Sequence, residues 1–197
     1  MKTMKKVMLT VIMVMVSTLA IANDKPTVKV ESVEAKTVAV IAYGLGGVAT
    51  DIQLKTGNGK VLYRESVKSG ENFAKKLELA AIPAGEYTLE VENANNFTAI
   101  PVVLTSSTAV VKIADKVTIV KPQLSMVGNK MNVVIAEELN QEVWVSIFDN
   151  DANRLAFEKV TPDNLKRFDL SRLKAGQYTI QLSTGGKNFV QSVSLDK

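Results

Sequence analysis

A phrase that occurs twice is the feature that most constrains the fold of this chain. Residues 81–91 read AIPAGEYTLEV and residues 172–182 read RLKAGQYTIQL, so one skeleton returns after 91 residues. Matches in the same order continue upstream, where residues 51–67 correspond to residues 144–160. Matches in fixed order over this length favour a duplicated domain over chance, because a chance match would not keep its order.

The duplication predicts where the domains begin and end. Residues 25–30 (KPTVKV) match residues 121–126 (KPQLSM), and we expect one domain over residues 23–120 and a second over residues 121–197. Residues 105–120 have no counterpart at the other end of the chain and are too apolar for a flexible linker. We therefore expect them to add a strand to the first domain and to lead into a short, stiff junction at Lys121-Pro122, since proline restricts the backbone.

The hydrophobic pattern within each copy has a period of two residues. Tyr87, Leu89 and Val91 alternate with polar residues, and residues 178–182 repeat the pattern. Such alternation is typical of a strand with one face toward a core and one toward water. With turn residues between about seven short strands per copy, it predicts an all-β fold of two tandem seven-stranded Ig-like or fibronectin-like Greek-key sandwiches. On this pattern Glu86, Glu90 and Glu92 would form a solvated face.

The repeated phrase has a physical explanation in such a fold. A Tyr near the start of the sixth strand often bonds the backbone a few residues upstream and pins the corner between the sheets. A glycine before it permits the tight backbone of the corner, and the preceding apolar residue fills the core. We assign this structural role to two sets of three residues, Ile82, Gly85 and Tyr87 in the first copy and Leu173, Gly176 and Tyr178 in the second.

The N-terminus predicts export. Three lysines, an apolar run from Val7 to Ala22 and the small-x-small ending Ala20-Ile21-Ala22 have the layout of a cleaved signal peptide over residues 1–22. Without that segment, 24 basic and 20 acidic residues become 21 and 20. The nearly neutral remainder argues against nucleic acid as a partner, and we expect no membrane span in the mature chain. The predicted location is the periplasm, the cell surface or the extracellular space.

Composition argues against catalysis. The chain has no histidine and no cysteine, which removes the commonest general base and the commonest metal ligands. We find no nucleophile–base pair and predict no enzyme activity, no cofactor and no metal site. One alternative stays open at residues 149–153, because closely spaced Asp and Asn oxygens suit calcium, although the same residues are ordinary in hairpin turns.

Two aromatic residues are the best candidates for a contact surface. The alignment makes Val145 and Ile147 inward-facing, so Trp144, Ser146 and Phe148 should point outward. The first copy has Asp51, Gln53 and Lys55 at those outward positions. Trp144 and Phe148 could form an apolar patch for a protein or a cell-surface glycan, or they could be covered by a loop or by the neighbouring domain.

The second copy resembles the C-terminal sorting domain of proteins exported by the Bacteroidota type IX secretion system. The resemblance rests on a Val-x-Ile-aromatic-Asp strand and a Leu-Ser-x-Leu-x-x-Gly-x-Tyr corner, here Val145, Ile147, Phe148, Asp149, Leu170, Ser171, Leu173, Gly176 and Tyr178. The first copy resembles small secreted Ig-like modules of the same bacteria. The resemblance implies β-sandwiches, an envelope or extracellular location and no enzymatic activity.

Three functions are compatible with the sequence. The preferred one is a non-catalytic exported binding or structural protein. The alternative is a small type IX secretion cargo whose domain at residues 121–197 is a sorting signal for the secretion machinery. The duplication disfavours this alternative, because one copy is not at the C-terminus. A periplasmic assembly chaperone of the fimbrial type is the third, but its subunit-anchoring basic pair has no counterpart here.

Overall fold

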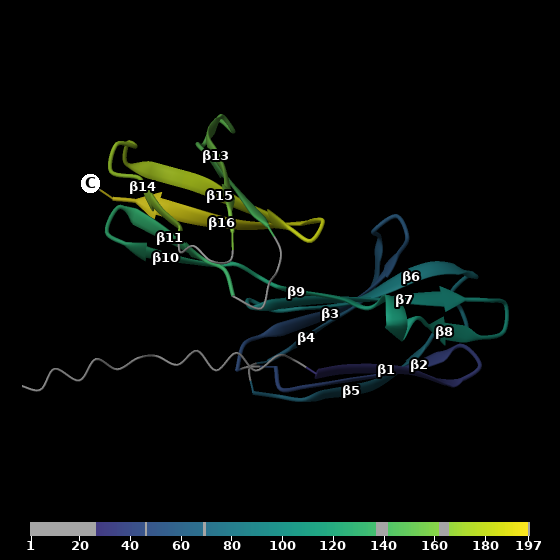
Figure 1. Ribbon diagram of the computed structural model, residues 1–197. Coiled ribbons are helices and arrows are strands. Elements are labelled where there is room, and N and C mark those ends of the chain that lie inside the picture. Colours follow the sequence, from purple (N-terminus) through teal and green to yellow (C-terminus); the bar gives the residue numbers. More distant parts are fainter. Residues whose placement is uncertain (1–26, 46, 69, 137–141, 162–165, 197) are drawn as a thin grey trace, which may run out of the picture.

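The computed structural model describes residues 27–45, 47–68, 70–136, 142–161 and 166–196. Antiparallel strands form most of this part of the chain (Figure 1). The one helical element described is a short 3-10 turn, η1 (Ile113–Asp115). The expected signal peptide lies outside the described residues. In the described part of the chain, no helix is long and apolar enough to span a membrane.

The first half of the chain forms two sheets. Sheet A has three strands in the order β1 (Thr27–Glu34), β2 (Thr37–Tyr43) and β5 (Phe73–Glu78). Sheet B has the order β4 (Val61–Val67), β3 (Thr50–Thr56), β6 (Gly85–Glu92), β7 (Asn96–Leu104) and β8 (Ala109–Val111), and β9 (Val117–Val120) also pairs with β7. We call these two sheets the first sandwich.

The second half repeats the arrangement. Sheet C has the order β10 (Gln123–Val127), β11 (Lys130–Val134) and β14 (Lys166–Asp169). Sheet D has the order β13 (Arg154–Val160), β12 (Val143–Phe148), β15 (Gly176–Thr184) and β16 (Lys187–Leu195). These sheets form the second sandwich, which has the seven expected strands, whereas the first has the same seven and adds β8 and β9.

The copies agree in detail as well as in strand order. In both copies one sheet is made of the first, second and fifth strands in that order. The other sheet has the fourth, third, sixth and seventh strands in that order. A register shift interrupts β3 and β4 between Leu54 and Lys55, and the same irregularity lies between Ile147 and Phe148 in β12 and β13. A bulge at one place in both copies bends the hairpin in the same way, so the duplication extends to irregular features.

Each sandwich has its own core, built by the inward residues of the period-two pattern. The first core contains Ile52, Leu54, Leu89 and Ile100, all almost fully buried. The second contains Val145, Ile147, Ile180 and Leu182. Each such side chain contributes about 1.5–3 kcal/mol by leaving water, so in this chain, which has no cysteine, packing of the two sheet faces is the main source of stability.

The residues without a counterpart form the two additional strands. β9 pairs with Asn96–Ala99 and β8 pairs with Val102–Leu104, so together they cover most of the outer edge of β7. The expectation of an extra strand in the first sandwich is confirmed, and there are two. The chain then passes through Lys121 and Pro122 directly into β10.

The first strands of the two copies differ from the sequence match by two residues. In sheet A, Val30 lies opposite Val40. In sheet C, Leu124 lies opposite Val133, which is the counterpart of Val40. The match of residues 25–30 with residues 121–126 is therefore wrong in register, and Leu124 takes the place of Val30. Both registers preserve the alternation of faces, because a shift of two residues returns each side chain to the same side.

Candidate functional site

The most exposed aromatic side chains of the second sandwich form a pair on the outer face of sheet D. The rings of Trp144 on β12 and Phe157 on β13 are stacked, with centroids 4.9 Å apart and planes 13° apart. Trp144 is 37% exposed and Phe157 is 51% exposed. Stacking adds about 0.5–1.5 kcal/mol beyond burial, and it holds both rings at one position on the face.

Two cations flank the ring pair. The guanidinium of Arg154 lies 4.8 Å from the Phe157 centroid, and the ammonium of Lys159 lies 6.0 Å from the Trp144 centroid. Lys159 also forms an ion pair with Glu142. Cations over ring faces are attracted by the electrons of the ring. We call Arg154, Phe157, Trp144 and Lys159 the aromatic–cation cluster.

The first sandwich has charged residues at the positions of the ring pair. Asp51 on β3 and Arg64 on β4 are the counterparts of Trp144 and Phe157, and they form an ion pair in place of the stack. Ser66 also donates a hydrogen bond of 2.5 Å to the Asp51 carboxylate. The hydrogen bond from Ser66 and the Arg64 charge outweigh the opposing effect of burial, and the pKa of Asp51 lies below its usual value. The apolar surface thus belongs to one copy only.

The sequence pattern predicts an exposed Trp144 but does not identify its ring partner. Phe148 lies four residues along the same strand, about 13 Å away at the usual rise of a strand, and it is half-buried beside the bulge. Ser146 lies on the outer face, as the alternation predicts, but it is buried there between Phe157 and Gln181 on the neighbouring strands. Phe157 could have been found by applying the alternation to β13, where it is exposed between half-buried Ala156 and Glu158.

A buried carboxylate joins the two sandwiches. Glu90 on β6 is only 7% exposed, and its oxygens accept hydrogen bonds from Lys55 at 2.5 Å and from Lys187 of the second sandwich at 3.2 Å. Burial opposes ionisation, but the bonds from the two lysines outweigh it and the pKa of Glu90 lies below its ordinary value. The expectation that Glu90 belongs to a solvated face is wrong, because the β15–β16 hairpin of the other sandwich covers it.

Aromatic contacts surround this ion pair. Lys187 lies 4.3 Å from the ring centroid of Phe97, and Lys121 of the junction lies 5.0 Å from that of Phe189. Lys121 also donates a 2.6 Å hydrogen bond to Glu92. Phe97 and its cross-strand neighbour Ile119 are almost fully buried, yet they belong to neither core. The first sandwich therefore buries apolar surface at the junction as well as charge.

The repeated tyrosines lie at the corners of their sandwiches. The hydroxyl of Tyr87 donates a 2.9 Å hydrogen bond to the carbonyl of Pro83, and that of Tyr178 donates a bond of the same length to the carbonyl of Lys174. Gly85 and Gly176 have φ of 157° and 153°, a conformation that L-residues rarely adopt. The deepest apolar residues of the corners are Leu79 and Leu170, while Ile82 and Leu173 pack at the rim of each core.

The acidic turn of the second sandwich is held by its own hydrogen bonds. One oxygen of Asp149 accepts bonds from the backbone amides of Asp151 and Asn153, and the other accepts one from the Asn153 side chain at 3.1 Å. The bonds from Asn153 hold the pKa of Asp149 below its usual value. These oxygens serve the turn in the manner of an Asx turn. In the described residues, no group of three or more acidic side chains could hold a metal ion.

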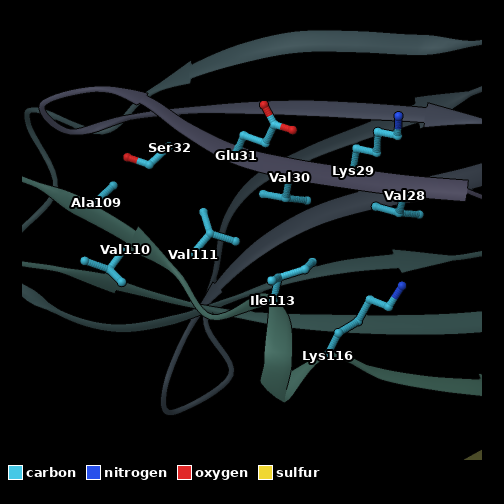
Figure 2. A pocket seen from close by; sticks show the side chains of 10 residues that line it. All are labelled: Val28, Lys29, Val30, Glu31, Ser32, Ala109, Val110, Val111, Ile113 and Lys116. Carbon is cyan, nitrogen blue, oxygen red and sulfur yellow. The ribbon is translucent and has the colours of Figure 1, made fainter.

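A groove of about 640 Å³ lies between the edges of sheets A and B. Figure 2 shows Val28 and Val30 from β1 opposite Val111 and Ile113, with Lys29, Glu31 and Lys116 at the rim. A hydrogen bond of 2.8 Å from the Ala109 amide to the Ala35 carbonyl holds β8 against the end of sheet A. β8 thus stands across the open side of the first sandwich, and its side chains share a core with Val30.

Comparisons with known proteins add little to this geometry. No protein-family model matches the chain, and no curated protein matches it. Eight chains of solved structures match. One of them, described as "Biofilm associated protein - BSP domain", is 17% identical over 85% of this chain with a TM-score of 0.29. The alignment spans 29% of that chain, and at this similarity it carries no argument about function.

Proposed function

We propose that this chain is an exported, non-catalytic binding or structural protein of the cell envelope or the extracellular space. The observation that carries the proposal is the aromatic–cation cluster on sheet D. Exposed Trp, Phe and Arg side chains are enriched where proteins bind partners. The copy in the first sandwich has an ordinary polar pair at the same positions, so the fold itself does not require the rings.

The chemistry of the cluster favours an acidic partner. Ring edges and the alkyl parts of the cations provide apolar contact. Glu142 balances the charge of Lys159, so the net positive charge beside the rings comes from Arg154. A glycan with carboxylates, or an acidic protein surface, would complement both features. The rings stand on the outer face of a sheet, so the partner would lie across that face, as extended polymers and protein surfaces do.

The contacts between the sandwiches support a working protein that keeps both halves. Removal of residues 121–197 as a sorting signal would expose Glu90, Phe97 and Ile119, which the junction buries. Lys55 would still pair with Glu90, but an exposed apolar patch at Phe97 and Ile119 would serve a mature cargo poorly. This favours the binding or structural role over the sorting role.

A binding assay with a matched control tests the proposal. The test variant combines Trp144→Ser with Phe157→Ser. The control variant combines Asp51→Ser with Arg64→Ser, which are the same two positions in the first sandwich. The probes are alginate, a polymer of uronic acids, neutral dextran, and producing cells with and without protease treatment. We expect the first variant alone to lose binding to alginate or to the cells, and added salt to weaken wild-type binding.

Two results would overturn the proposal. One is equal binding by both double variants, which would place the contact surface elsewhere. The other is a wild type that binds alginate and dextran equally and binds protease-treated cells as well as untreated cells. That result would exclude both an acidic glycan and an acidic protein as the partner. Charge reversal at Arg154 and Lys159 separates the charge contribution from the ring contribution, because it leaves Trp144 and Phe157 in place.

A further inference from the structure

We infer that the second sandwich pairs edge to edge with a second copy of this chain through β16. The inference is independent of the aromatic–cation cluster, which lies near the opposite edge of sheet D on β12 and β13. It starts from a difference between the two copies. In the first sandwich β8 and β9 pair with the outer edge of β7, whereas β16, the counterpart of β7, pairs with β15 alone among the described strands.

The uncovered edge is long and regular. β16 runs for nine residues from Lys187 to Leu195, and its pairing with β15 has no register shift. Such an edge presents a row of unpaired backbone amides and carbonyls that accepts another strand. The first sandwich demonstrates the point within the same chain, since the equivalent edge of β7 does accept antiparallel strands.

The edges on the far side of the second sandwich, β13 and β14, carry the features that prevent such pairing. β13 has the bulge opposite Phe148 and the charges of Arg154, Glu158 and Lys159. β14 has Lys166, Arg167 and Asp169 within four residues. Charges and bulges on an edge discourage pairing with another chain. β16 has neither from Asn188 to Leu195, and β10, the edge of sheet C on the same side, is also uncharged.

Side chains along this open side are less covered than their counterparts. Ile100 on β7 is fully buried, whereas its counterpart Gln191 on β16 faces inward and is exposed. Val30 is 5% exposed, and its counterpart Leu124 is half-buried. Inward-facing Met126 is 36% exposed. Among the described residues, no strand of the second sandwich therefore takes the place that β8 has in the first.

The sequence of β16 is compatible with itself in antiparallel pairing. A two-fold axis through Gln191 would place Phe189 opposite Val193 of the second copy and Val190 opposite Ser192. Like charges do not meet, and Val190, which is 60% exposed, gains a neighbour. A two-fold contact must be self-complementary in this way. A groove of about 240 Å³ beside Asn188–Gln191 and Lys121–Gln123 leaves room at the junction for the end of the second copy's strand.

Analytical ultracentrifugation of the chain without residues 1–22 tests the inference. Wild type should show a monomer–dimer equilibrium. Gln191→Lys places two ammonium groups opposite each other across the axis and should raise the dimer dissociation constant by at least about 10-fold. Leu155→Lys is the matched control, because Leu155 is an exposed apolar residue on β13, the opposite edge of the same sheet, and it should leave the equilibrium unchanged.

A crosslinking measurement keeps the test valid if the lysine variant folds poorly. The chain has no cysteine, so Gln191→Cys introduces a single thiol that should form a covalent dimer on mild oxidation, with Leu155→Cys as the control. A wild type that stays monomeric at millimolar concentration overturns the inference. So does a dimer that Gln191→Lys and Leu155→Lys weaken equally, or one that is lost only when Trp144 and Phe157 are replaced.

Discussion

Trp144 and Phe157 stack across β12 and β13 at the two positions where Asp51 and Arg64 form an ion pair across β3 and β4. The register of both hairpins is the same, so the comparison is between identical sites in one molecule. The same diagonal pair of positions therefore holds an aromatic stack in one copy and an ion pair in the other. The difference isolates what the second sandwich adds to the shared fold.

Replacing the ring pair should change stability little. Trp144→Ser and Phe157→Ser remove exposed side chains and should each lower the free energy of unfolding by about 1 kcal/mol or less, mainly through the lost stacking. Urea denaturation of each variant measures this. Ile147→Ala on the buried face of β12 is the control and should cost about 2–5 kcal/mol. A loss of that size in the ring variants would mean that the rings are a structural contact.

Acid should weaken the junction through Glu90. Its pKa is lowered in the folded protein, so its stabilising effect is present above the unfolded value near 4.5 and is lost as the pH falls through the folded value. Glu90→Gln should therefore lower stability at pH 7 and reduce the loss between pH 5 and pH 3. Thermal unfolding at several pH values measures both effects.

The control for this experiment is Glu86→Gln, which changes an exposed carboxylate of the same strand. It should leave the acid limb of the stability profile as in wild type. Lys187→Met tests the other partner and should cost about 1–3 kcal/mol, because it removes the bond from the second sandwich to a buried carboxylate. Identical pH profiles for wild type and Glu90→Gln would contradict the assigned role.

The hydroxyls of the two corner tyrosines should contribute similarly to the free energy of unfolding. Tyr87→Phe and Tyr178→Phe each remove one hydrogen bond to a backbone carbonyl and should cost about 0.5–1.5 kcal/mol in denaturant unfolding. Tyr43→Phe is the control, because Tyr43 is exposed on β2, and it should be nearly neutral. A large loss in the control, or none at either corner, would refute the corner role of the hydroxyls.

Residues 121–197 should not act alone as a sorting signal. Fused to a reporter that carries a signal peptide and produced in a host with type IX secretion, they should leave the reporter in the periplasm. Cell fractionation and the mass of the full-length protein measure the outcome. Two results together would establish the sorting role in place of the proposed one. The reporter would be released into the medium, and the protein produced without a reporter would be found cleaved, without its C-terminal part.

The repeated phrase was enough to predict the class of fold. Patterns within a few residues predict three features of the structure: the order of the strands, an extra strand after residue 105, and the inward positions of Val145 and Ile147. Local patterns are informative here because a strand's alternation and a turn's residues act over neighbouring positions. The same patterns do not determine the register of the first strand pair, since a shift of two residues preserves the alternation.

What covers each face was decided only by the tertiary structure. The alternation of residues 85–92 assigns Glu90 to the outer face of sheet B, and that assignment holds, but the second sandwich covers that face at Glu90. Likewise, the alternation places Trp144 outward without naming Phe157 as its neighbour on β13. A sequence determines which side of its own strand a residue occupies. Exposure and partners depend on which strand lies alongside and which element packs above, and these contacts join positions far apart in the chain, as Lys187 and Glu90 do.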